Sequence, residues 1–126
     1  MIVVDTDVLI EIFDRKSVKG KEALNMILDS GEVACITAIN LHEILFGLEK
    51  YAKPVKEVLR LPVLGYLKRD ACVAAKMELE MERSGCAIRR TDAMIAAVTV
   101  NNGAVLFTFD LKHFKPLEKL GLKLFS

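Results

Sequence analysis

The sequence of 126 residues lacks or has few of the residue types on which several common kinds of functional site depend. It contains no tryptophan, only two histidines (His42 and His113) and three cysteines. Cys35, Cys72 and Cys86 show no C-x-x-C spacing and lie in apolar or helical surroundings. They are therefore predicted to be small buried side chains in a reduced cytoplasm, not ligands of zinc or partners in disulfides. No Ser, Cys and His constellation accompanies the histidines, so both are predicted to be surface residues.

Long apolar runs and an excess of positive charge are also missing. The longest uninterrupted apolar stretch, residues 93–98, is far too short to span a bilayer. No basic leader with a cleavage site precedes Asp5, so we expect no export signal, no membrane segment and a cytoplasmic protein. Lys and Arg total 18 against 17 Asp and Glu, a net charge of +1. Any interaction with nucleic acid must therefore depend on local residues.

What the sequence does contain is an alternation of strand-like and helix-like apolar patterns. Strands are predicted at residues 2–4, 33–36, 63–66, 104–109 and 122–125. Helices are predicted between them, at residues 8–13, 18 to about 31, 38–48, 70–84 and 92–101, with short helices after Pro54 and Asp110. Strands separated by helices imply βαβ units and a mainly parallel sheet. We predict one α/β domain over residues 1–126, a three-layer α/β/α sandwich with about five strands.

Three sets of apolar residues lie at helical spacing. One face of the second helix carries Val18, Leu24, Ile27 and Leu28. The inward face predicted for the third helix carries Leu41, Ile44, Leu45 and Leu48. Met77 and Met81, four residues apart, predict packing in the core or in a dimer interface and not a ligand site.

Acidic side chains follow two of the predicted strands at the point where each strand ends. Asp5 comes directly after the first strand and Asp110 after the strand at 104–109, and ligands of open α/β sheets bind outside the carboxyl ends of the strands. Asp92 opens a helix, and Glu43 shares a stripe with Asn40 beside the apolar face of another. We therefore expect the four carboxylates to converge. Taken singly, each acid has a simpler explanation, because Asp commonly caps helices and helical Glu is commonly solvated.

Converging carboxylates would raise one another's pKa and destabilise the fold unless a cation neutralised them. Mg²⁺ or Mn²⁺ is the natural partner, since hard cations prefer carboxylate oxygens. Water bound to such an ion is a better nucleophile, and the ion offsets negative charge on phosphoryl oxygens. The acids therefore suggest metal-assisted phosphoryl chemistry, which needs neither histidine nor cysteine.

Four segments resemble, in order, the four motifs of PIN domains. The first, for example, is a short strand that ends in Asp and continues with Thr and a polar residue. The segments are residues 3–10, 37–47, 91–97 and 107–114, which carry Asp5, Glu43, Asp92 and Asp110 respectively. They extend over nearly the whole chain, and its length is similar to that of the toxin nucleases of VapBC-type toxin–antitoxin pairs.

The resemblance implies a Mg²⁺- or Mn²⁺-dependent endoribonuclease that forms a homodimer and is inhibited by a small partner antitoxin. Asp5, Glu43, Asp92 and Asp110 match the acidic, metal-binding and catalytic positions of the family. Thr6 and Thr108 match its hydroxyl positions beside the metal site. Asp7 stands where the family has Asn, Ser or Asp, and it is assigned a supporting role.

Basic residues flank two of the acids. Arg89 and Arg90 lie just before Asp92, and Lys112 lies just after Asp110. These cations could engage RNA phosphates at the rim of the acidic crevice. The alternative is that they are ordinary solvated charges that balance the acids.

Other functions fit parts of the pattern. A PIN-like scaffold could bind RNA or protein without cutting. A haloacid-dehalogenase-like phosphatase would use Asp5 as a covalent nucleophile and explain Asp7, but it leaves Glu43 and Asp92 without a role. A receiver domain would also need acids after the first strand, yet it expects them adjacent in sequence and a lysine after a late strand.

Overall fold

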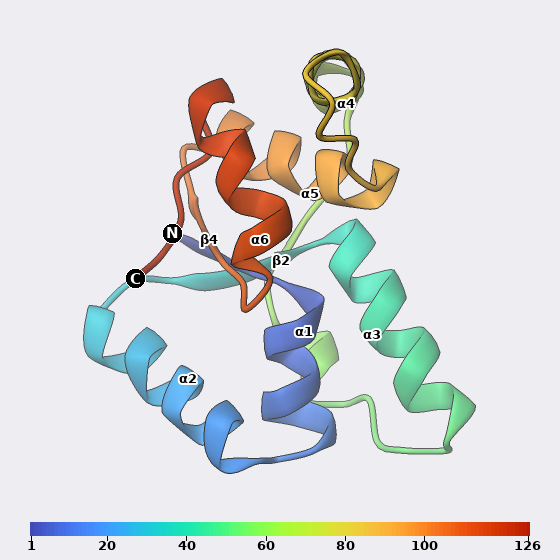
Figure 1. The fold of residues 1–126 in the computed structure, drawn as a ribbon. Helices are drawn as coiled ribbons and strands as arrows, with labels where there is room; N and C mark the ends of the chain where they lie inside the picture. Colours follow the sequence, from blue (N-terminus) through green and yellow to red (C-terminus); the bar gives the residue numbers. More distant parts are fainter.

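The computed structural model describes all residues, 1–126, and forms an α/β sandwich around a four-stranded parallel sheet (Figure 1). The strands lie in the order β3-β2-β1-β4. They are β1 (Ile2–Val4), β2 (Ala34–Thr37), β3 (Val63–Leu64) and β4 (Val105–Phe107). The α-helices are α1 (Thr6–Leu9), α2 (Val18–Ser30), α3 (Ala38–Lys50), α4 (Lys68–Arg83), α5 (Arg90–Asn101) and α6 (Leu111–Phe114). A π-helix, η1 (Ile10–Asp14), continues α1, and two 3₁₀ helices are η2 (Val58–Arg60) and η3 (Lys115–Leu120).

The two faces of the sheet bury two separate apolar clusters, which confirms the three layers. Side chains alternate between the faces of a strand. Val3 therefore packs with the residues of α4 and α5, whereas Ile2 and Val4 pack with those of α1, α2 and α3. Figure 1 shows α4 and α5 on one side of the strands and α1 and α2 on the other. Each helix layer covers one apolar face, and the sheet is closed to water on both sides.

The sheet has one strand fewer than expected. The segment predicted as a fifth strand makes only an isolated parallel bridge between Leu124 and Leu106. The amide of Phe125 donates to the carbonyl of Leu106 at 2.8 Å, so the segment lies at the sheet edge beside β4. Because the chain first turns at Gly121, where φ is +105°, too few residues follow to extend the pairing. The C-terminus consequently lies beside the N-terminus (Figure 1).

Two helices begin earlier than predicted. The helix α4 begins at Lys68 instead of Asp70, because the buried Asp70 carboxylate accepts a hydrogen bond from the Leu67 amide at 2.8 Å and so caps the first turn. The helix α5 begins at Arg90 instead of Asp92, with Arg89 in the extended N-cap conformation. Asp92 thus lies in the first turn, where the helix dipole favours negative charge.

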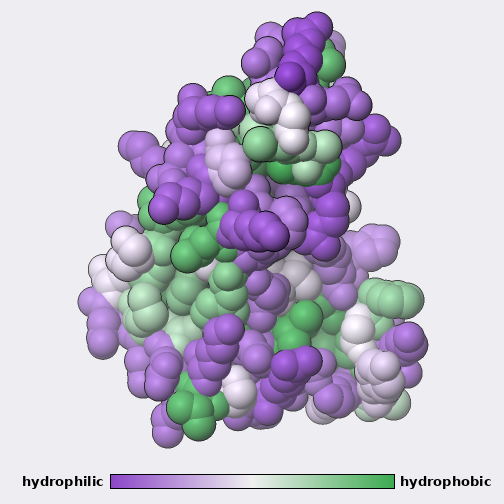
Figure 2. Space-filling view, in the orientation of Figure 1, coloured by the Kyte–Doolittle hydropathy of each residue, from purple (hydrophilic) through white to green (hydrophobic).

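The apolar face predicted for α2 was wrong for three of its four residues. Val18, Leu24 and Leu28 are 76%, 40% and 66% exposed, whereas the buried residues are Gly20, Ala23 and Ile27. Gly20 has no side chain and Ala23 has only a methyl group, so the helix approaches the rest of the protein closely at these positions, while Val18, Leu24 and Leu28 face outward. Figure 2 shows hydrophobic surface over the left-hand side of the molecule, where α2 lies in Figure 1.

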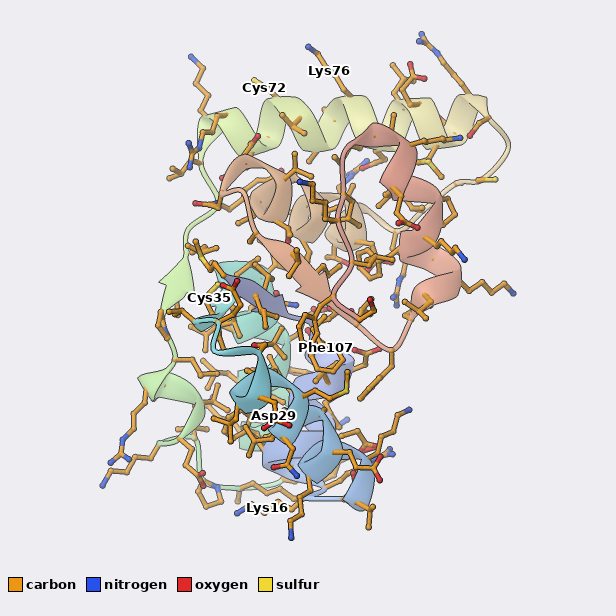
Figure 3. The ribbon with its side chains drawn as sticks, turned by 90° about the vertical axis from the view of Figure 1, so that its left-hand side faces the viewer. Lys16, Asp29, Cys35, Cys72, Lys76 and Phe107 are labelled. Carbon is orange, nitrogen blue, oxygen red and sulfur yellow. The ribbon has the colours of Figure 1, made fainter.

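The methionine and cysteine predictions had different outcomes. Met77 and Met81 are buried in the core, as predicted. Cys35 is buried in β2, but Cys72 and Cys86 are exposed, because each lies on a helix face or turn directed away from the core. Figure 3 shows Cys72 on the outer side of α4 and Cys35 within the body of the protein. None of the helices is both long and apolar enough to cross a membrane.

Candidate active site

All four predicted acids line one pocket at the carboxyl ends of β1 and β4. Asp5 follows β1, Asp110 follows β4, Asp92 lies in the first turn of α5, and Glu43 lies on α3. The pocket has a volume of about 210 Å³ and is lined by Asp5, Thr6, Asp7, Ile10, Glu43, Arg89, Asp92 and Asp110. Asp5 and Asp110 also cap α1 and α6. Both explanations therefore hold for Asp5 and Asp110: each caps a helix, and each lines the pocket. Because β1 and β4 pair in parallel, their carboxyl ends bring the two caps together.

Asp5 is the most constrained of these acids. Its side chain is 7% exposed. One carboxylate oxygen accepts hydrogen bonds from the Thr6 amide at 2.9 Å and from the Asn40 side-chain amide at 3.2 Å. The other accepts a hydrogen bond from the Thr108 hydroxyl at 2.7 Å. Thr6 in turn donates its hydroxyl to Glu43 at 2.7 Å, so both predicted hydroxyl residues orient acids of the pocket.

Asn40 is a residue that the sequence analysis did not assign to the site. It is fully buried, and its amide nitrogen donates to Asp5 and, at 3.1 Å, to the Thr6 hydroxyl. Its amide oxygen accepts from the Thr37 hydroxyl at 2.7 Å within the capping box of α3. The available signal was its position three residues before Glu43. Asn40 thus fixes the start of α3 to the strand end that carries Asp5.

We expect replacement of Asn40 by Ala to destabilise the protein by about 2 kcal/mol, because it leaves buried hydrogen-bonding groups of Thr37 and Asp5 unsatisfied. Chemical denaturation of the metal-free variant measures this loss. Asn40→Asp keeps the shape but adds a buried charge next to Asp5, so it should be at least as destabilised at neutral pH. A stability equal to wild type in both variants would contradict the role of the network.

Three acids of the pocket have raised pKa values, as expected where carboxylates are buried close to one another. Burial, followed by the nearby Asp7 carboxylate, raises the pKa of Asp5 to about 7, although hydrogen bonds from Thr108 and Thr6 oppose the rise. Burial also raises the pKa values of Asp7 and Asp92. The hydrogen bonds of the network do not compensate for desolvation of these carboxylates.

Asp7 has one carboxylate oxygen with a partner and one without. Its Oδ2 accepts a hydrogen bond from the Phe109 amide at 3.2 Å. Its Oδ1 is buried and has no hydrogen-bond partner. Buried polar atoms are rarely left unpaired in native proteins, so this oxygen, on a residue that lines the pocket, fits the donor set of a hard cation.

The three basic residues predicted to bind RNA have different surroundings in the structure. The Arg89 guanidinium contacts Asp92 at 3.1 Å and Asp110 at 3.7 Å, and it lines the pocket. Arg90 instead pairs with Glu78 on α4, with two contacts of 3.1 Å. Lys112 lines a different surface pocket, beside Lys115. Only Arg89 therefore reaches the acids directly.

Both histidines are exposed, as predicted. His113 nevertheless lies close to an acid in the folded protein, and not only in the sequence. Its Nδ1 lies 2.8 Å from both carboxylate oxygens of Asp110. Asp110 thus has two neighbours that can carry positive charge, His113 and Arg89.

In this conformation no three Asp, Glu, His or Cys side chains are arranged so that they could hold one metal ion together. The carboxylates line a common pocket, but Arg89 engages both oxygens of Asp92, at 3.1 and 3.4 Å. Carboxylate oxygens are the ligands that hard cations such as Mg²⁺ prefer, and the positive charge that faces them in this structure is a guanidinium.

The chain is similar in sequence and in fold to known proteins. The chain is 25% identical over 118 residues to Ribonuclease VapC2 of Haemophilus influenzae, with 88% of this chain and 87% of that protein covered. It is 28% identical over 96 residues to the tRNA(fMet)-specific endonuclease VapC of Salmonella typhimurium, with 71% and 73% covered. The crystal structure of DNA-bound VapBC from Salmonella typhimurium superposes with a TM-score of 0.78 at 26% identity, with 98% and 96% covered.

The family assignment rests on a match that extends over nearly the whole chain. The model of the PIN domain family matches residues 2–120, a range that includes every residue of the acidic pocket. This match excludes the phosphatase and receiver-domain alternatives. The chain therefore belongs to the PIN domain family.

Proposed function

We propose that this protein is a divalent-metal-dependent endoribonuclease that hydrolyses RNA phosphodiester bonds at the acidic pocket. The observation that carries the proposal is the convergence of five carboxylates, from β1–α1, α3, α5 and β4–α6, in one small pocket. Repulsion between carboxylates this close together destabilises the protein unless the site binds a cation. The VapC relatives named as a ribonuclease and as a tRNA-specific endonuclease support hydrolysis of RNA.

The residues present fit Mg²⁺ or Mn²⁺. Carboxylate oxygens are the preferred ligands of both ions, and Oδ1 of Asp7, which has no hydrogen-bond partner, is a further oxygen that could bind a cation. We assign Asp5, Glu43, Asp92 and Asp110 as the holders of the metal. Asp7 supports them, since its second oxygen is tied to the Phe109 amide. When bound, a divalent cation supplies a water of lowered pKa and offsets charge on the phosphate.

The chain's own residues orient and neutralise the reacting groups. Thr6 donates a hydrogen bond to the Glu43 carboxylate and Thr108 donates one to the Asp5 carboxylate, so both hydroxyls orient acids of the pocket. Arg89 provides a planar guanidinium that matches the oxygens of a phosphate. Asp110, whose side chain is 27% exposed, is the carboxylate that could accept the proton of an attacking water.

The RNA strand would reach the pocket along its exposed rim. Arg89 is the residue we assign to the scissile phosphate, because it alone among the basic residues lines the pocket. Arg90 and Lys112 are exposed, and if they bind RNA they contact phosphates farther from the cleavage point. Their removal is expected to reduce the salt dependence of RNA binding.

We propose further that the protein acts as the toxin of a toxin–antitoxin pair and that it forms a homodimer. The VapBC complex among the structural relatives supports a small protein partner. The exposed apolar residues of α2, with Val18 and Leu28 outermost, offer a surface that such a partner could bury. Size-exclusion chromatography with light scattering would decide the oligomeric state.

The decisive test is cleavage of a mixed pool of single-stranded and structured RNA by the purified protein, with Mg²⁺, Mn²⁺ or EDTA. We expect cutting with either ion and none with EDTA. Glu43→Gln keeps the size of the side chain while it removes a metal ligand, so it serves as the control for contaminating nucleases. Cleavage that persists in this variant or in EDTA would contradict the proposed site. Binding of RNA without cleavage under every condition would favour a non-cutting PIN-like scaffold.

A further inference from the structure

Arg89 is the only cationic side chain that lines the acidic pocket. Its Nε lies 3.1 Å from Oδ2 of Asp92 and its Nη2 lies 3.4 Å from Oδ1 of the same residue. The same Nη2 lies 3.7 Å from Oδ2 of Asp110. One guanidinium therefore contacts both oxygens of a buried acid on α5 and approaches a second acid, which follows β4.

The two members of this pair differ greatly in exposure to solvent. The Asp92 side chain is 5% exposed, whereas that of Arg89 is 69% exposed. Arg89 lies at the N-cap of α5, outside the helix, and both of its side-chain hydrogen bonds go to Asp92. Apart from Asp92 and the longer contact with Asp110, nothing in the chain holds the guanidinium, so it can leave the acids by side-chain rotation alone, whereas Asp92 is enclosed by the protein.

A divalent cation would need the oxygens that Arg89 now engages. Each oxygen of Asp92 already accepts a hydrogen bond from the guanidinium. A divalent cation bound to the same carboxylate would lie a few Å from the positive charge of Arg89, and like charges at that distance repel strongly in a partly buried site. Binding of the metal to Asp92 therefore favours withdrawal of the guanidinium. The absence of any three-ligand arrangement in the present conformation agrees with this.

We propose that Arg89 is a resident counter-cation that the divalent metal must displace. This inference rests on the proposed metal-dependent function. In the metal-free protein the guanidinium neutralises Asp92 and Asp110 and stabilises the fold. On metal binding it moves to the rim of the pocket, where its charge faces the RNA phosphate. The residue thus lowers the affinity for metal and couples metal loading to the release of a phosphate-binding group.

The neighbouring Arg90 provides a matched control. It carries the same charge one residue later, but its guanidinium pairs with Glu78 of α4. A general change in net charge would affect the Arg89 and Arg90 variants alike. A specific competition at the pocket would affect only Arg89.

The experiment measures Mn²⁺ binding to the full chain, by electron paramagnetic resonance of free Mn²⁺ and by calorimetry, for wild type, Arg89→Ala, Arg89→Gln and Arg90→Ala. We expect both Arg89 variants to bind Mn²⁺ about tenfold more tightly, the order expected when one nearby like charge is removed from a partly screened site. Without metal they should melt at a lower temperature than wild type, and saturating Mn²⁺ should restore their melting temperature. Arg90→Ala should match wild type in Mn²⁺ affinity.

The outcomes separate this inference from the proposed function. Unchanged or weaker Mn²⁺ affinity in both folded Arg89 variants, with clear binding by wild type, would overturn the counter-cation role and leave the metal site standing. An equal gain of affinity in Arg90→Ala would overturn it too, since the effect would be one of net charge. No Mn²⁺ binding by any of the four proteins would overturn the proposed metal-dependent function itself.

Discussion

Asp5→Asn is expected to abolish RNA cleavage and at the same time to make the metal-free protein more stable. The loss of activity should exceed about a hundredfold, because removal of a ligand costs more than the 10- to 100-fold that loss of an outer-shell partner typically causes. The gain in stability arises because the substitution removes a buried charge that lies beside Asp7. Asparagine keeps an acceptor for the Thr6 amide and for Asn40, and the Thr108 hydroxyl can accept from its new amide.

The size of the stability gain should depend on pH. The pKa of Asp5 is about 7 in the folded protein, against an ordinary value of 3.8. Between these values the folded state binds more protons than the unfolded state, so stability falls as the pH rises from about 4 to 7 and changes little above it. A shift of about 3 pH units corresponds to about 4 kcal/mol, as an upper limit shared with the coupled Asp7 and Asp92.

Urea denaturation in EDTA between pH 4.5 and 8 measures this dependence. We expect the wild type to lose stability over that range and Asp5→Asn to lose much less. Saturating Mn²⁺ should stabilise the wild type near pH 8 but not the variant. A variant that is less stable than wild type at pH 8 without metal, or that still cleaves RNA, would show that Asp5 is not a strained metal ligand.

Gly20→Ala is expected to destabilise the protein by about 3 kcal/mol or more, at the upper end of the cost of overpacking. A Cβ atom at Gly20 would lie 2.1 Å from the carbonyl oxygen of Glu11 and 2.8 Å from the amide nitrogen of Ile12. These are backbone atoms of η1, so no side chain can rotate away to relieve the clash. The helix α2 would have to move from the π-helix on which it packs. We expect the melting temperature to fall by roughly 10 °C.

Gly47→Ala is the matched control for this substitution. Gly47 lies inside α3, and a Cβ atom there would meet nothing within 4 Å. The change should therefore stabilise the protein by about 0.5–1 kcal/mol, the difference in helix propensity between Gly and Ala. Differential scanning calorimetry of both variants tests the pair. Similar melting temperatures for the two would mean that α2 does not pack on η1 as closely as described.

Much of the site could be predicted because it depends on local features. Strands are short apolar runs, and an Asp directly after a strand must lie at its carboxyl end wherever the strand is placed in a parallel sheet. For Asp5 and Asp110 this was sufficient to predict that they meet. Neither Glu43 nor Asp92 follows a strand directly. Their prediction rested on helix positions, with Glu43 beside an apolar face and Asp92 at a helix start, together with the pattern of the PIN motifs.

The remaining features depend on contacts between segments distant in sequence. Arg89 and Arg90 are indistinguishable by composition, and only the packing of α4 against α5 directs Arg90 to Glu78 and leaves Arg89 for the pocket. Asn40 has a functional position because the N-terminus of α3 lies beside β1. The buried face of α2 follows from its close approach to η1, which selects Gly20 and Ala23 over larger apolar residues.

The sequence by itself thus determined the layers, the order of the elements and the acidic character of the site, because periodicity and strand-end residues act locally. The tertiary structure decided which cation neutralises the acids, which amide orients Asp5, and whether the last segment pairs as a strand. These outcomes depend on contacts between different elements of the fold, such as Arg90 with Glu78, Asn40 with Asp5 and Phe125 with Leu106. No local pattern encodes such contacts.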